Sequence, residues 1–271
     1  MPYWQVHFLN ARHALTGIMP EVRAAVAESV ARVSGHLDLP PFDVVVRAGD
    51  GGLDWGVLGA VPAPGVVELT LSPARFAHDL TVRRMLRELH HIARWDGPGY
   101  GRSLGEVLVS EGLAGHFVAR LLGGAPDPWD ATTPPSGLAK RAMTEWAWRD
   151  LDRGLWFEGR GNIRKWAGYG LAHRLLAEHL SREPEADADA LVRLPAEALR
   201  PAMRRLSGAP EVEPEPALPM QEPAAVPVAA EAVPQPDKGS QAPAPEASGK
   251  DMPPQAKGAP AASGDEPLPQ A

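Results

Sequence analysis

The chain contains no cysteine among its 271 residues, which excludes disulfide bonds and metal sites built on thiolates. It has no apolar run that approaches the length of a membrane-spanning helix. Its first residues, MPYWQVHFLNARHALT, contain no charged leader followed by an unbroken apolar stretch, so we expect no secretory signal. These absences predict a cytoplasmic protein without a membrane partner.

A basic excess is also missing from the chain. Half of the 30 prolines lie after Ser207, in a segment without aromatic residues. Of the 34 acidic and 27 basic residues, ten and three lie in that segment, which leaves 24 of each sign before it. A nucleic-acid surface needs a basic excess on one face, so we expect no nucleic-acid partner. The segment itself cannot bury enough apolar surface to offset its ordering entropy.

We therefore predict one folded domain at residues 1–206 and a disordered, acidic, proline- and alanine-rich tail at residues 207–271. The domain holds all eight tryptophans and is long enough to form a substantial core. The tail contains EPEP and QAPAPEA, which favour extended polyproline conformations. One hypothesis is that the tail binds a partner or acts as a spacer.

The first third of the domain has the patterns of strands and of one helix. Helical spacing that closes on Gly35 predicts a helix at residues 20–35. We expect residues 51–65, which are rich in glycine and proline, to join strands as a loop or hairpin. Alternating or β-branched runs predict strands at YWQVHFL, FDVVVRAG and GVVELTL.

From Ser72 onward the apolar spacing becomes helical. Ser72-Pro73 is a helix-start signal, and Ser103 with Glu106 forms a capping box for the next helix. Strands first and helices later indicate an α+β fold. The expected helices span about residues 72–95, 103–122, 137–151 and 163–181, with a short helical pair near 188–206.

The first of these helices carries part of a metal-binding motif. In LRELHHIARW, residues 86–95, a glutamate stands three residues before a histidine, as in the zinc-protease motif H-E-x-x-H. The position of the first histidine holds Arg87. Helical spacing puts Arg87, Glu88 and His91 on or near the side opposite the apolar stripe, with Arg87 and His91 one turn apart.

Glu111 is the second signal, because it stands in the middle of the apolar stripe of the following helix. Burying a bare carboxylate costs several kcal/mol, so we expect Glu111 to be paired, protonated or bound to a cation. A buried ion pair would explain this position. Glu111 also lies 20 positions after His91, the spacing expected when a second helix returns a glutamate to a zinc ion.

A longer set of motifs resembles a bacterial family of predicted zinc-dependent proteases, a domain of unknown function. The motifs are ELHHIARWDGPGYGRSLGEVLVSEGLAGHF followed by LWFEGRGNIRKWAGYGLAHRLL. The resemblance implies a zincin-like fold that binds zinc and hydrolyses peptide bonds through a metal-activated water. It further implies that Glu88 is the general base and that His91 and Glu111 are zinc ligands.

Arg87 departs from the family pattern, because arginine has no lone pair to offer a metal and stays protonated. If it points inward, it repels a metal ion and offers Glu111 a bidentate partner. Two hypotheses follow. In the first, Arg87 swings out of the cleft and the protein is a zinc metallopeptidase. In the second, Arg87, Glu88, His91 and Glu111 form a charge network in a metal-free pseudo-protease that acts as a binding or scaffold protein.

Other histidines could complete or support a metal site. His90 is turned about 100° from His91 on the same helix, which makes it a poor ligand. His116, five residues after Glu111, is a candidate for a hydrogen bond that orients a ligating group. His78, His173 and His179 stay open as alternatives.

Two tyrosines could donate a hydrogen bond to a developing oxyanion. Tyr100 lies in the loop GPGYG and Tyr169 in a late helix, and packing against Trp95 or Trp166 is the simpler interpretation of each. The strand GVVELTL could bind an extended peptide by edge pairing. The expected partner is a peptide or protein, as substrate or as ligand.

Overall fold

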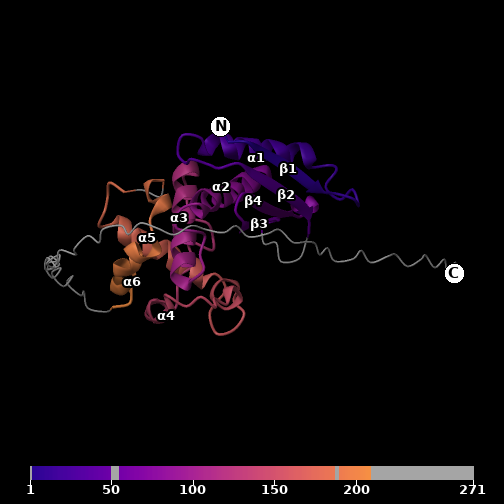
Figure 1. The fold of residues 1–271 in the computed structure, drawn as a ribbon. Coiled ribbons are helices and arrows are strands. Elements are labelled where there is room, and N and C mark those ends of the chain that lie inside the picture. The colour runs from indigo at the N-terminus through magenta and orange to yellow at the C-terminus, as the bar shows by residue number, and fades with distance from the viewer. Residues whose placement is uncertain (1, 50–54, 187–188, 209–271) are drawn as a thin grey trace, which may run out of the picture. The chain divides into compact units, whose positions relative to one another are not determined.

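The computed structural model describes residues 2–49, 55–186 and 189–208, and Figure 1 shows their course. The predicted α+β class is confirmed, because a sheet near the N-terminus is followed by helices. Most of the predicted tail lies outside the described residues, and the domain boundary at residue 206 stays a prediction. The strands and α-helices are β1 (Trp4–Leu9), α1 (Met19–Val33), β2 (Phe42–Ala48), β3 (Val57–Ala63), β4 (Val66–Leu71), α2 (His78–Trp95), α3 (Leu104–Leu122), α4 (Leu138–Glu145), α5 (Ala167–Leu180) and α6 (Arg200–Leu206).

The four strands form one sheet in the order β1-β2-β4-β3. Strands β1, β2 and β4 run parallel, and β3 pairs antiparallel with β4 through a turn at Gly65, whose φ is +68°. The hairpin expected within residues 51–65 therefore includes a strand, β3. Our expectation that GVVELTL could pair with a peptide at an edge is wrong, because β4 lies between β2 and β3. The edge strands of the described sheet are β1 and β3.

The sheet is covered on one face. Alternate residues of β2 and β4, such as Val44, Val46 and Leu69, are fully buried with α1 and α2 in one apolar cluster. The other face carries polar side chains, among them Arg47, whose Nε donates to Thr70 Oγ1 at 2.9 Å. Buried and exposed residues alternate because successive side chains of a strand point to opposite faces of the sheet.

The capping box predicted for α3 is present, since Ser103 Oγ accepts from the backbone N–H of Glu106 and Glu106 Oε2 accepts from that of Ser103. Three other helix bounds differ from expectation. Helix α2 begins at His78 because Ser72 starts only a 3₁₀ turn, Pro73–Arg75, before an extended stretch. Helix α5 begins at Ala167 because Trp166 has a left-handed backbone with φ of +70°. Helix α4 ends at Glu145, and the carbonyls of Trp146 and Trp148 then accept from the first N–H groups of α3.

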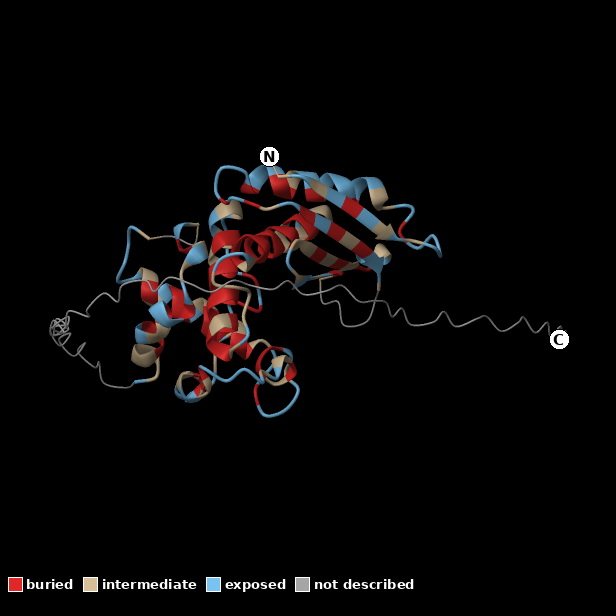
Figure 2. Cartoon of the chain, viewed as in Figure 1, coloured by how far each residue is buried: buried red, intermediate tan, exposed pale blue. Residues whose placement is uncertain are grey.

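A second apolar cluster fills the helical half, where α4, α5 and α6 gather around α3 (Figure 1). Helix α2 lies between the two clusters and is buried without interruption from Met85 to Arg94, as the red ribbon of Figure 2 shows. The polar side of α2 thus faces the helical half and not solvent. None of the described helices is long and apolar enough to cross a membrane.

Candidate functional site

Arg87 lies at the centre of a buried group of charges, with 1% of its surface exposed. Its Nε and Nη2 donate to Glu111 Oε2 at 3.2 and 3.1 Å. Its Nη1 and Nη2 donate to the two carboxylate oxygens of Asp130 at 2.9 and 3.2 Å. The guanidinium of α2 therefore lies between a carboxylate of α3 and a carboxylate of the loop that follows α3.

Glu111 uses both oxygens. Oε1 accepts from Tyr100 Oη at 3.2 Å and from Arg153 Nη2 at 3.0 Å. Oε2, the acceptor of Arg87, also lies 3.5 Å from His91 Nε2. Burial raises the pKa of Glu111, but His91, Arg87 and Arg153 outweigh burial and hold that pKa well below its usual value. The carboxylate is ionised and fully paired.

The sequence did not predict Asp130, Asp127 or Arg153 as members of this network. Asp130 is 3% exposed, and burial is the main reason why its pKa is raised despite the contact with Arg87. Asp127 Oδ2 lies 3.9 Å from Arg87 Nη1, and its other oxygen pairs with Arg83. The local sequence feature that could have indicated these acids is the stretch DPWD, in which Asp127 and Asp130 lie on either side of Trp129.

Glu88 lies beside the network and has no cation in bidentate contact. Its Oε1 is 3.6 Å from Arg84 Nη1, and its Oε2 has no hydrogen-bond partner among the described residues. Gly59 of the edge strand β3 makes room for this carboxylate, since a Cβ there would lie 2.5 Å from Glu88 Oε1. The residue in the base position thus faces β3.

Tyr100 and Tyr169 both reach the site. The Tyr100 ring packs 4.3 Å from the His91 ring and 5.9 Å from that of Trp95, so it combines a polar contact with packing. The Arg87 guanidinium carbon lies 5.4 Å from the centre of the Tyr169 ring. Burial, with Glu111 as a second cause, raises the pKa of both phenols. Each phenol therefore keeps its proton at neutral pH.

His116 is engaged elsewhere. Its Nε2 donates to the carbonyl of His173 at 3.0 Å, and the two imidazoles stack 4.0 Å apart. Burial lowers the pKa of His116 to about 4, so this imidazole is neutral at physiological pH. Its observed hydrogen bond goes to a backbone carbonyl and not to Glu111 or His91.

The side chains around Arg87 do not fit a zinc ion. Zinc needs about three protein lone pairs that converge on one point. Here a guanidinium stands in the first ligand position, and the oxygens of Glu111 accept hydrogen bonds from Arg87, Arg153 and Tyr100. Within the described ranges, no group of three His, Asp or Glu side chains could hold a metal ion.

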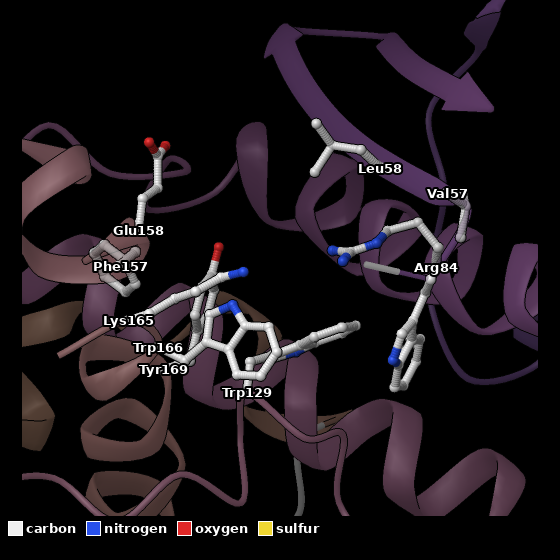
Figure 3. A pocket seen from close by; sticks show the side chains of 10 residues that line it. Val57, Leu58, Arg84, Trp129, Phe157, Glu158, Lys165, Trp166 and Tyr169 are labelled. Atoms are coloured by element: carbon white, nitrogen blue, oxygen red, sulfur yellow. The ribbon is translucent and has the colours of Figure 1, made fainter. Parts of the chain in front are cut away.

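Two neighbouring hollows border this site. The larger, about 790 Å³, runs along β3 opposite Tyr100 and Arg153. The smaller, about 420 Å³, is drawn in Figure 3 and lies beside Arg84 and Trp129. The two share Leu58, Phe157, Glu158 and Tyr169 as lining residues. Together they form a groove beside the edge strand, which we call the β3 groove.

A comparison with models of protein families gives a match. A family model described as "Predicted Zn-dependent protease (DUF2268)" matches residues 23–200, more than half of the chain. A search of the curated proteins finds no match. The matched residues include α2, α3 and every residue of the charge network.

Proposed function

The chain belongs to the family of predicted Zn-dependent proteases (DUF2268), and we propose that this member binds peptide segments without hydrolysing them. In this proposal an ion-pair network takes the place of the zinc. The single observation that carries it is the inward position of Arg87, in contact with Glu111 and Asp130. The family description points to zinc dependence in the family, and Arg87 is the reason why we propose that this member does not bind the metal.

The electrostatics favour the guanidinium over a metal ion. Burial lowers the pKa of Arg87, but Asp130 and Glu111 outweigh burial and hold that pKa above its already high usual value. The group is therefore always charged, and a divalent cation beside it would be repelled. Turning Arg87 outward would strip Glu111 of one of its two arginine partners and Asp130 of the guanidinium that contacts both of its oxygens. Such a change costs about 3–5 kcal/mol.

The β3 groove supports a peptide or protein ligand. Within the described residues, β3 pairs with β4 alone, so backbone groups on the other side of β3 are available to an added strand. Leu58 and Ala60 of β3 are exposed beside the groove, and Pro62, which has no N–H, limits such pairing at its far end. The ligand that fits this geometry is an extended chain segment.

The alternative is an active zinc metallopeptidase in which Arg87 turns outward and Glu88 acts as general base. The family description favours this alternative, and so does the Glu88 carboxylate, which faces β3 and has one oxygen without a hydrogen-bond partner among the described residues. In this alternative, Glu111 has to give up its hydrogen bonds from Arg87, Arg153 and Tyr100 in order to bind a metal. The two functions differ in metal content, which can be measured directly.

Replacing Arg87 tests the proposal. We expect the natural protein to hold well below about 0.1 zinc per chain, while Arg87→His completes a set of two histidines and a glutamate and gains about one zinc per chain. Arg87→Leu is the matched control, because it removes the same charge without supplying a lone pair. Elemental analysis and zinc titration of the full-length proteins give the readout.

A double variant, Arg87→His with Glu111→Gln, is expected to lose the gained affinity. About one zinc per chain in the natural protein, together with peptide hydrolysis that Glu88→Gln abolishes, would establish the metallopeptidase instead. Equal zinc affinity of Arg87→His and Arg87→Leu would show that the account of the replaced ligand is wrong.

A further inference from the structure

The larger hollow of the β3 groove is lined by three arginines. Strand β3 contributes Leu58 to Pro62 to the lining of this hollow. Arg102 lies just before α3, and Arg149 and Arg153 lie in the segment after α4. Guanidiniums from two separate segments therefore gather beside the strand edge on which we propose that a peptide binds.

Two of these arginines keep their full capacity to bind a ligand. Arg102 and Arg149 are exposed. The backbone N–H of Arg102 donates to Glu106, but neither guanidinium has a hydrogen-bond or ion-pair partner among the described residues. A guanidinium stays charged and presents a planar fork of donors that matches a carboxylate. Arg102 and Arg149 can thus bind a carboxylate without giving up a contact inside the protein.

The third arginine connects the hollow to the buried charge network. Arg153 Nη2 donates to Glu111 Oε1 at 3.0 Å, yet 40% of the Arg153 side chain is exposed. The contact with Glu111 fixes the position of this guanidinium at the hollow. It also means that Arg153 contributes less to binding a ligand than the two arginines without a partner.

The acidic residues near the hollow do not cancel this charge. Among the described lining residues the acid is Glu158, whose Oε2 accepts from Arg160 Nη2 at 2.6 Å. Asp150 and Asp152 follow Arg149 in the chain, but they line a separate hollow of about 100 Å³ and not this one. Three arginines and one paired carboxylate leave the larger hollow positive, and such a surface attracts anionic ligands.

We infer that the β3 groove selects an acidic segment of a partner protein, with glutamate or aspartate side chains bound by Arg102 and Arg149. Successive side chains of an extended segment point to opposite faces of the sheet, so acids at every second position lie on one face. Arginine and carboxylate can then pair through two parallel hydrogen bonds. The inference rests on the proposed function and names its ligand class, because the backbone of the segment pairs with β3.

Three labelled peptide pools test this inference on the full-length protein. Each pool carries an N-terminal fluorescein and a C-terminal amide, and every second position is glutamate, glutamine or lysine while the others are randomised among uncharged residues. We expect fluorescence anisotropy to show that the glutamate pool binds at least about 5-fold more tightly than the glutamine pool, the effect of one or two exposed ion pairs. The lysine pool should bind most weakly, because like charges repel.

Substitutions of Arg149 locate the effect. We expect Arg149→Gln to weaken binding of the glutamate pool about 3-fold and to leave binding of the glutamine pool unchanged. Arg149→Glu should also raise the affinity for the lysine pool above that of the natural protein. Arg174→Gln on α5 is the matched control, because Arg174 is exposed, loses the same charge and lines neither hollow. It should change no affinity.

The possible failures are distinguishable. Equal binding of the glutamate and glutamine pools would overturn the acidic ligand class and leave peptide binding in the β3 groove intact. Absence of binding by every pool would overturn the proposed function together with the inference. A glutamate preference that survives both Arg149→Gln and Arg102→Gln unchanged would place the acids elsewhere. Equal losses in Arg149→Gln and Arg174→Gln would replace the site by a general attraction between charges.

The chain itself supplies the competing occupant. Its C-terminal segment contains EVEPE, residues 211–215, with glutamates at every second position. Replacing these three glutamates by glutamine in the full-length protein should leave the affinity for the glutamate pool unchanged. An affinity at least about 5-fold higher in that variant would show that the protein's own segment fills the groove, and would overturn a partner protein as the occupant.

Discussion

The guanidinium of Arg87 is a planar cation that pairs with buried carboxylates, as a metal ion does with its point charge. Its fork of N–H groups satisfies oxygens of Glu111 and Asp130 at once, and Arg153 adds a second cation on the far oxygen of Glu111. A buried network of this kind contributes little net stability compared with apolar packing, because both signs must be desolvated. Breaking it from one side is costly, because the remaining charges stay buried without a partner.

Glu111→Gln tests this at the residue scale. We expect the free energy of unfolding to fall by about 3–5 kcal/mol at pH 7, because Arg87 and Arg153 lose their shared carboxylate. The folded-state pKa of Glu111 lies well below the reference value of 4.5. Its stabilisation is therefore fully present above that value and is lost as the pH falls through the lower folded pKa. Urea titrations should show that the free energy of unfolding of Glu111→Gln differs from that of the natural protein by a constant amount down to about pH 5. Below that pH the difference should shrink.

Glu185→Gln is the control for this prediction. Glu185 is exposed, and its replacement should change the free energy of unfolding by less than about 0.5 kcal/mol at every pH. A difference between Glu111→Gln and the natural protein that stays the same at pH 3 would show that the ionised carboxylate is not the source of the effect.

The buried charge of Glu111 could be predicted from the sequence, because a glutamate that interrupts an apolar helical stripe needs a partner. One of its partners, Arg87, could be predicted from helical spacing. Asp130 and Arg153 could not, since they lie in segments whose approach to α3 depends on tertiary packing and not on local pattern. The roles of Glu88, His91, Tyr100 and Tyr169 as site residues stay predictions.

At the scale of elements, α3 is packed closely on several sides, and its glycines make this possible. Gly105 faces the indole of Trp146, and Gly112 faces the backbone carbonyl of Ala172 on α5. Gly115 faces the Asp130 carboxylate, which a Cβ at position 115 would approach to 2.6 Å. A glycine one turn after Glu111 thus leaves space for the second acidic partner of Arg87.

Gly115→Ala has two opposing effects. Alanine favours the helix by up to about 1 kcal/mol, but the methyl group displaces a buried carboxylate that cannot swing to solvent. We expect the displacement to win and the free energy of unfolding to fall by about 1–3 kcal/mol, measured by urea titration. Gly17→Ala is the matched control, because nothing lies within 4 Å of its added Cβ, and it should be neutral or slightly stabilising. An unchanged or raised stability of Gly115→Ala would contradict this packing.

Element types could be predicted better than strand order. Alternation of apolar and polar residues predicted β1, β-branched runs predicted β2 and β4, and the capping box predicted the start of α3. Strand β3 was not predicted as a strand because glycine and proline are disfavoured in strands, although an edge strand tolerates Pro62. The position of a strand in the sheet depends on pairing between distant segments, so the sequence could not show that GVVELTL, as β4, lies between β2 and β3.

At the scale of the whole domain, α3 contributes side chains to both apolar clusters, Phe117 and Val118 to the first and Leu104 to Leu113 to the second. The first cluster fills the space between the sheet, α1 and α2, and the second fills the helical half around α3. The charge network of Arg87 and Glu111 spans the boundary, and helices α2 and α3 pack against each other there. The side chains of α2 and α3 at this boundary are buried, so unfolding of one half would expose the packed surface of the other half to water, which couples the unfolding of the two halves.

This coupling predicts that a destabilising substitution in either apolar cluster lowers the hydrogen-exchange protection of both halves. Leu69→Ala in β4 and Leu175→Ala in α5 each remove a fully buried leucine side chain, and each should lower the free energy of unfolding by about 2–5 kcal/mol. In hydrogen-exchange mass spectrometry, the slowest amides of β2 and of α5 should lose protection equally in both variants. Leu9→Ala on β1, where the leucine is 62% exposed, should change neither. If Leu175→Ala loosens α5 while β2 keeps the protection of the natural protein, the halves unfold separately and the buried network does not connect them.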